Sequence, residues 1–397
     1  MGLLDFIKKQ KPIQSSETQQ DIISSPKPTY NEVSNQEVVT QTTLSKTSIK
    51  PDEPTPLNIL LKSATPSKQG LYPHEILMLE YAPRFKTSNN QFQNFWYWQY
   101  SVTDPQSVLD SLLERGFIKK GDLKSALEKL KLPEIKEELK QLNQKVTGKK
   151  SELIDRLINS ADLSVLNKKY SERYYALTSK GEQELKENQY VSYLHRNRYM
   201  TVWEMNQRIA QTHYPFKDIL LEYFTEQSNI HFQNFDFGLY SNDCLNIYKL
   251  LMEKNNTKTA FHMLCELLLL DLSGLSNNDD YLFECKDSNP ELYLEIYRLR
   301  FQYFFPYEKS TLIIPPAVLS WFQEMQAILG LDDNDYKKAI MKELQVVHLP
   351  YQIFTNEECV DIIIANIHND TTTLVTIYKK AEKRENERLK EIMSKIK

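Results

Sequence analysis

Apolar residues recur at helical spacing through the second half of the chain, from about Pro215 onward. Residues three, four and seven positions apart share one face of a helix, so this spacing predicts helices that each bury one side. Stretches rich in Asn, Asp, Ser and Pro interrupt the pattern at 276–280 and 310–316. The expected helical segments are 217–225, 237–253, 257–272, 291–304, 316–329, 333–346 and 356–368, followed by a charged helix from about residue 372. The pattern predicts a multi-helix C-terminal domain over residues 211–397.

The middle of the chain combines helix signals with two short strand signals. Asp104-Pro105 opens a helix, with Asp as N-cap and Pro in the first turn, and Gly116 ends it. A strand is expected from Phe117, and a second one at 174–177 precedes a helix that Thr178 caps. These pieces resemble the recognition helix, wing strands and closing helix of winged-helix DNA-binding domains. The resemblance implies a winged-helix-like domain over 56–210 whose wing carries an insertion.

Two other segments of this domain contain aromatic or basic side chains. Trp96, Trp98 and Tyr100 alternate along 95–100, which predicts one face of a strand or extended segment. Such a row could stack on nucleic-acid bases, but burial in a core is the more common role of aromatic side chains. Residues 195–198 hold a histidine and two arginines. They offer either a second basic contact or the solvated surface of a loop before a core helix.

The insertion, at about residues 122–160, is predicted to contain two short amphipathic helices. The apolar face of the first comprises Ile135, Leu139 and Leu142, and that of the second comprises Leu153, Ile154 and Leu157. Pro133 suits the first turn of the first helix. Asn143 lies where the chain must reverse, and Asn tolerates the left-handed conformation. Thr147 is a natural N-cap for the second helix.

Gly148, Lys149 and Lys150 are thereby expected in the first turn of the second helix. Lysines are unfavourable there, because the helix dipole prefers anions at its N-terminus, unless an anion is bound. Backbone N–H groups and two ammonium groups would then point at one place, and Gly148 would let a phosphate oxygen approach the backbone. Arg156 could reach a second phosphate, and Lys145 is a further candidate. The alternative is a solvated helix end without a ligand.

The whole stretch resembles a SAP module, a small helix–turn–helix-like unit. The matching positions are Leu132, Ile135, Leu139, Val146, Gly148, Lys150, Leu153, Ile154, Arg156 and Leu157. Asn143 stands where Gly is usual, and Gln144 stands where an apolar residue is usual. The resemblance implies DNA binding through backbone and groove contacts. Some SAP modules contact proteins instead, so a scaffold in which this module docks a protein partner is the alternative.

Charge near the module differs from the charge of the whole chain. The net charge is -4 at pH 7, but many cations flank the two helices. They are Arg115, Lys119, Lys120, Lys124, Lys129, Lys131, Lys136, Lys140, Lys145, Lys168 and Lys169. Carboxylates of the first helix dilute this positive charge, so we expect modest, salt-sensitive affinity. With about two to four phosphates neutralised, log K should fall with log salt at a slope of about -2 to -3.5, with little base specificity.

Composition argues against several other classes of function. The chain has 9 glycines in 397 residues and no G-x-G, so no phosphate-cradling loop of the dinucleotide or P-loop kind is expected. The four cysteines are widely spaced, which predicts reduced thiols in a cytoplasmic protein without a metal site or cofactor. The Cys265–His262 pair and Cys359 with its neighbouring glutamates lack a third orienting group. We therefore expect no enzyme activity, with a site in the C-terminal half as a third alternative.

The N-terminal region differs in composition from the rest. Residues 1–10 could form one short amphipathic turn, as a docking peptide or a frayed terminus. Residues 11–55 are rich in Ser, Thr, Gln and Pro, which predicts a disordered linker. No apolar run reaches membrane-spanning length. The high usage of Lys, Asn, Ile and Tyr is typical of an AT-rich bacterial or phage genome.

Together these patterns predict a mainly α protein. A SAP helix–turn–helix module lies within a winged-helix-like domain, and a multi-helix C-terminal domain follows. The expected function is non-catalytic binding of DNA, most simply double-stranded, through Lys145, Gly148, Lys149, Lys150 and Arg156. The C-terminal domain is expected to contact a protein partner or to self-associate.

Overall fold

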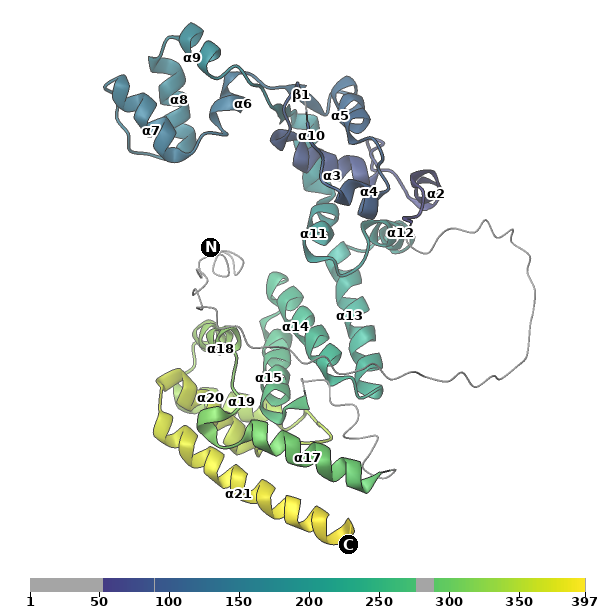
Figure 1. Ribbon diagram of the computed structural model, residues 1–397, viewed down its shortest axis with the longest axis vertical. Coiled ribbons are helices and arrows are strands. Elements are labelled where there is room, and N and C mark those ends of the chain that lie inside the picture. Colours follow the sequence, from purple (N-terminus) through teal and green to yellow (C-terminus); the bar gives the residue numbers. More distant parts are fainter. Residues whose placement is uncertain (1–52, 89, 276–288, 397) are drawn as a thin grey trace, which may run out of the picture. The chain divides into compact units, whose positions relative to one another are not determined.

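The computed structural model describes residues 53–396 apart from 89 and 276–288 (Figure 1). The predictions for residues 1–10, for most of 11–55, and for the helix break at 276–280 lie outside the described residues. Helices dominate the described part of the chain, and its β-structure is one two-stranded sheet and an isolated bridge. The mainly α prediction is confirmed. No helix in this part of the chain combines the length and apolar character that a bilayer crossing requires.

The first part of the described chain, up to residue 212, contains short helices and both strands. In chain order its elements are α2 (Leu57–Ser63), α3 (Pro73–Tyr81), η1 (Ala82–Arg84), α4 (Phe95–Tyr100), α5 (Pro105–Glu114), β1 (Ile118–Lys120), α6 (Leu123–Leu127), α7 (Leu132–Gln141), α8 (Lys150–Ser160), α9 (Leu163–Lys169), β2 (Tyr175–Leu177), α10 (Ser179–Glu187), α11 (Gln189–Asn197) and α12 (Val202–Thr212). Two N-caps predicted from the sequence are present in the structure. The Asp104 carboxylate accepts hydrogen bonds from two backbone N–H groups of α5, and the Thr178 hydroxyl accepts one from Gly181.

The two strands pair although more than fifty residues separate them. β1 and β2 are antiparallel, with Ile118 opposite Leu177 and Lys120 opposite Tyr175. The pairing extends one step further, because the N–H of Gly121 donates to the carbonyl of Tyr174 at 2.8 Å. The two ends of the insertion therefore leave the sheet side by side.

Residues 95–100 form helix α4, so the prediction of a strand or extended segment was wrong. Trp96 and Tyr100 are buried, whereas Trp98 is 57% exposed and does not share their face. Trp96 and Tyr100 are four residues apart, and such positions share one face in a helix and in a strand. The spacing of these two aromatic residues therefore did not distinguish a helix from a strand. The strand would also have needed a pairing partner, and the helix satisfies its own backbone groups.

Of the basic residues at 195–198, Arg198 lies in the loop before α12 as the C-cap of α11, and the other two do not. His195 and Arg196 belong to the last turn of α11. Both ring nitrogens of His195 are hydrogen-bonded, to the hydroxyl of Tyr81 at 2.9 Å and to that of Tyr100 at 3.0 Å. Burial lowers the pKa of His195. This half-buried imidazole joins α11 to α3 and α4, so its role in the structure is packing.

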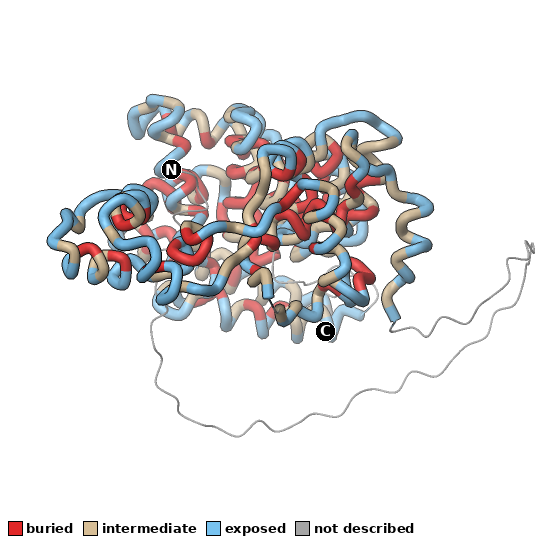
Figure 2. Tube along the Cα trace, turned by 90° about the horizontal axis from the view of Figure 1, so that it is seen from above, coloured by how far each residue is buried: buried red, intermediate tan, exposed pale blue. Residues whose placement is uncertain are grey.

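Longer helices make up the second part of the described chain. They are α13 (Phe216–Gln233), α14 (Phe237–Glu253), α15 (Thr257–Ser273), α17 (Pro290–Phe304), η3 (Tyr307–Lys309), α18 (Pro316–Leu329), α19 (Asp333–Leu344), α20 (Asn356–His368) and α21 (Thr371–Ile396). Every helical segment expected from the apolar spacing corresponds to one of these helices. Buried and exposed positions alternate along these helices, as amphipathic helices require, and Figure 2 shows the same mixture of buried and exposed positions along the helical coils of the described chain.

Candidate nucleic-acid interface

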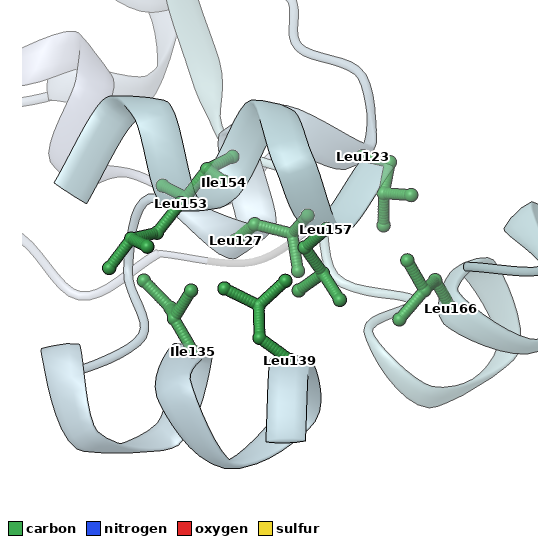
Figure 3. Packing of buried hydrophobic residues seen from close by; sticks show 8 residues of the cluster. All are labelled: Leu123, Leu127, Ile135, Leu139, Leu153, Ile154, Leu157 and Leu166. Carbon is green, nitrogen blue, oxygen red and sulfur yellow. The ribbon is translucent and has the colours of Figure 1, made fainter. Parts of the chain in front are cut away.

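Helices α7 and α8 pack against each other through the apolar faces that the sequence predicted (Figure 3). Their buried residues are Ile135, Leu139, Leu153, Ile154 and Leu157, each at most 1% exposed. Leu142 packs against them and is partly buried. The inserted segment thus has a hydrophobic core of its own.

The same core includes residues that the sequence analysis missed. Leu123 and Leu127 come from α6, and Leu166 comes from α9. Both helices have a visible start signal, since Asp122 and Asp162 each accept a hydrogen bond from a backbone N–H two residues later. Helices of five and seven residues are too short for a periodic apolar pattern, so only these caps could have revealed them.

The linker between α7 and α8 has a defined shape. Asn143 adopts the left-handed conformation expected of it, with φ 54°. The N–H of Gln144 then donates to the carbonyl of Leu139 at 2.8 Å, which ends α7. Further on, the guanidinium of Arg156 donates to the carbonyls of Lys145 at 2.7 Å and Thr147 at 3.2 Å. Arg156 therefore fixes the linker from α8, a role that the sequence analysis did not foresee.

Helix α8 begins later than the sequence predicted. Its N-cap is Lys149 and its first residue is Lys150, so Gly148 and Lys149 precede the first turn and Thr147 is not the cap. The Glu152 carboxylate accepts a hydrogen bond from the N–H of Lys149 at 3.2 Å. This bond satisfies a free N–H group at the helix start and places a negative charge near the helix N-terminus, both of which favour Lys149 over Thr147 as the N-cap.

Gly148 has a backbone conformation that favours glycine. Its φ is 135°, and a Cβ at this position would lie 2.6 Å from a carboxylate oxygen of Glu152. We expect Gly148→Ala to destabilise the SAP-like segment by about 1–3 kcal/mol, because the new side chain strains the backbone and disturbs the Glu152 bond. Hydrogen exchange of the α7 and α8 amides would measure this loss. Equal protection in the variant and the wild type would contradict the assigned backbone strain.

The candidate cations surround the linker and the start of α8, but their environments differ. Lys145 and Lys149 are exposed, and neither ammonium group has a hydrogen bond or ion pair with the described residues. The Lys150 ammonium donates to the carbonyl of Glu128 at 2.7 Å. Gly148 lies beside the Glu152 carboxylate, as described above. Lys145 and Lys149 therefore have ammonium groups without partners among the described residues. Lys150 and Gly148, by contrast, take part in contacts within the SAP-like segment.

Several flanking cations are neutralised by neighbouring carboxylates. Ion pairs join Lys124 to Asp155 at 2.7 Å, Lys169 to Glu138 at 2.6 Å and Lys140 to Glu137 at 3.8 Å. Arg115 likewise pairs with Glu75. The positive charge counted along the sequence is therefore reduced in the fold at these positions.

Residues 126–161 match the family model of the SAP domain. This segment is a SAP domain. The match includes α7, the linker and α8, and it excludes α9, although Leu166 of α9 completes the same core. A SAP domain indicates nucleic-acid binding in general. No curated protein and no solved structure matches the chain.

The C-terminal helices carry the other groups considered from the sequence. The His262 imidazole lies 3.0 Å from the Glu343 carboxylate and not against a thiol. Cys265 and Cys359 are buried, and burial raises the pKa of both thiols, which disfavours the nucleophilic thiolate. Among the described residues, no group of three or more His, Cys, Asp and Glu side chains could hold a metal ion. Cys285 lies outside the described residues.

Proposed function

We propose that the SAP domain binds double-stranded DNA through backbone phosphates and without catalysis or a cofactor. The supporting observation is the position of Lys145, Lys149 and Lys150 around the linker and the start of α8. All three are exposed, and none forms an ion pair within 4.0 Å with a carboxylate of the described residues. Ammonium groups without carboxylate partners can release counterions from DNA, which supplies most of the non-specific affinity.

The five residues selected from the sequence have different roles in this proposal. Lys145 and Lys149 contact phosphates directly, because their ammonium groups are open. Lys150 shares its ammonium group between a phosphate and the Glu128 carbonyl. Gly148 and Arg156 act indirectly by shaping the linker. A phosphate oxygen could approach Gly148 only by displacing the Glu152 carboxylate, which is unfavourable.

The elements on either side of the SAP domain are given proposed roles as well. We interpret α5, β1, β2 and α10 as a winged-helix-like unit whose wing strands carry the SAP domain. The helices from α13 onward are proposed to serve contacts with a protein partner or self-association. The protein is proposed to act in the cytoplasm, and its composition fits an AT-rich bacterial or phage genome.

Salt dependence tests the proposal with the full-length protein. We expect fluorescence anisotropy with a labelled duplex to give a log K against log salt slope of about -2 to -3.5 between roughly 50 and 200 mM salt. Duplexes of unrelated sequence should bind with similar affinity, because phosphate contacts carry no sequence information. Absence of binding at the low salt concentration would refute the proposed function.

A second candidate function is the docking of a protein partner by the SAP domain. It is favoured by two apolar side chains of α9, Leu163 and Val165, which are 48% and 59% exposed. Exposed apolar side chains beside a folded core are typical of interaction surfaces when they cluster. Under this alternative, Leu163→Ser with Val165→Ser would abolish partner capture, and Lys149→Glu with Lys150→Glu would leave duplex binding unchanged.

A further inference from the structure

Tyr174, which precedes β2, contacts one cation of the SAP domain and forms a backbone bridge close to a second cation of the fold. The Lys129 ammonium is 5.1 Å from the centre of the Tyr174 ring. The Lys150 ammonium donates to the carbonyl of Glu128, so it is held beside the backbone of Lys129. Lys129 and Lys150 belong to the SAP domain. A further cation, Arg84, is the last residue of η1 and lies outside the SAP domain.

Backbone pairing places the two residues that follow Arg84 beside Tyr174 and Tyr175. Arg84 is the last residue of η1, and its guanidinium lies over the Tyr81 ring, 4.3 Å from the ring centre. The next two residues run beside β2, because the carbonyl of Phe85 accepts from the N–H of Tyr175 at 3.1 Å and Lys86 forms a β-bridge with Tyr174. Tyr174 is therefore a neighbour both of the Lys129 side chain and of the two residues that follow η1.

The three cations influence one another electrostatically. The pKa of Lys129 is lowered, chiefly by partial desolvation of its ammonium group, and the positive charges of Lys150 and Arg84 lower it further against the opposing effect of Glu128. Like charges that lie within interaction range destabilise one another unless an anion lies between or beside them. A bound phosphate would remove this repulsion.

Other cations nearby already have carboxylate partners. Lys86 pairs with Glu172 at 2.5 Å, and Lys124 and Lys169 are paired as described above. By contrast, Arg84, Lys129 and Lys150 form no ion pair within 4.0 Å in the described part of the chain, and all three are exposed. Positive charge thus remains where the SAP domain joins the rest of the fold.

We propose that Arg84, Lys129 and Lys150 form a phosphate-binding junction. Through it, a nucleic-acid backbone continues from the SAP domain onto η1 and the residues that pair with the start of β2. This inference rests on the proposed function of the SAP domain. The ligand is a phosphodiester backbone, because successive phosphates can contact cations on both sides of the junction. The binding surface then exceeds the SAP domain and includes a residue, Arg84, that lies outside the family match.

The test compares neutralising substitutions in the full-length protein by the salt dependence of duplex binding. Arg84→Gln with Lys129→Gln is expected to reduce the magnitude of the log K against log salt slope by about 1–2. At about 50 mM salt we expect roughly tenfold weaker binding. Arg84→Lys should keep the wild-type slope, because it keeps the charge.

The matched control is Lys124→Gln with Lys169→Gln, which removes the same charge from two cations that already have carboxylate partners. This variant should keep the wild-type slope. If the Arg84 and Lys129 variant also keeps it while Lys149→Glu with Lys150→Glu weakens binding, the junction is refuted and the SAP interface stands. If the wild type does not bind duplex at all, the proposed function fails and the junction fails with it.

A partly unfolded variant would still give an interpretable result. A constant inactive fraction shifts log K by the same amount at every salt concentration and leaves the slope unchanged. A loss of the Arg84 contact with Tyr81 would therefore lower apparent affinity without changing the slope. Only the loss of a phosphate contact reduces the slope.

Discussion

Reversing the charge of Lys149 and Lys150 together is expected to weaken duplex binding by roughly 30- to 140-fold, since two charge-assisted contacts of about 1–1.5 kcal/mol each are lost. The slope of log K against log salt should become shallower by about 2. The Lys149 side chain has no partner in the described fold, and Lys150 has only the Glu128 carbonyl, so the substitutions remove little packing. Fluorescence anisotropy over a salt series, with full-length K149E/K150E, measures both quantities.

A second adjacent pair of exposed lysines, Lys379 and Lys380 of α21, provides the control. K379E/K380E changes the net charge by the same amount but lies outside the SAP domain. We expect it to bind duplex as the wild type does, apart from a small long-range effect that salt screens. Equal losses in the two variants would mean that overall charge, and not the SAP domain, determines binding.

The largest effect on stability is expected from Leu157→Ala in the centre of the SAP core. Leu157 is 0% exposed and contacts side chains from the other helices of its cluster. Replacing a buried Leu by Ala removes transfer free energy and leaves a cavity, which costs about 2–5 kcal/mol. A domain of this size has little stability to lose, so we expect α7 and α8 to unfold locally and duplex binding to fall with them.

Hydrogen exchange is the appropriate measurement because it reports on the amides of α7 and α8 individually, whereas one melting temperature for the whole chain would not report on this domain. Amides of α7 and α8 should lose protection, whereas amides of α14 and α15 should not. Leu163→Ala, at a 48% exposed position of α9, is the control and should change stability by no more than about 0.5 kcal/mol. Full protection of α7 in the Leu157 variant would show that this core does not hold the domain together.

The sequence was sufficient for features that depend on neighbours along the chain. Apolar spacing located the helices from α13 onward, and it selected the buried faces of α7 and α8. Caps such as Asp104 and Thr178 located helix starts, because their side chains bond to backbone groups two or three residues away. The winged-helix interpretation of the surrounding elements stays a prediction.

At the candidate interface, sequence reasoning selected the right positions but not their local contacts. Lys149 and Lys150 do lie at the start of α8, yet helix α8 begins at Lys150 because Glu152 accepts from the N–H of Lys149. Arg156 was expected to face a phosphate, and it instead donates to two linker carbonyls. A long side chain can reach several possible hydrogen-bond partners, and the sequence does not indicate which of them it will bond to.

The sequence by itself determined the helical character, the SAP domain and the position of its cations, because propensity, periodicity and capping act over one or two turns. Only the tertiary structure decided which cations remain open and which are paired, because residues such as Lys169 and Glu138 lie far apart along the chain. It also placed Lys129 over the ring of Tyr174 and paired the same tyrosine with Lys86, two residues after Arg84. Charge acts through space, so the electrostatic surface follows from the fold and not from the order of residues.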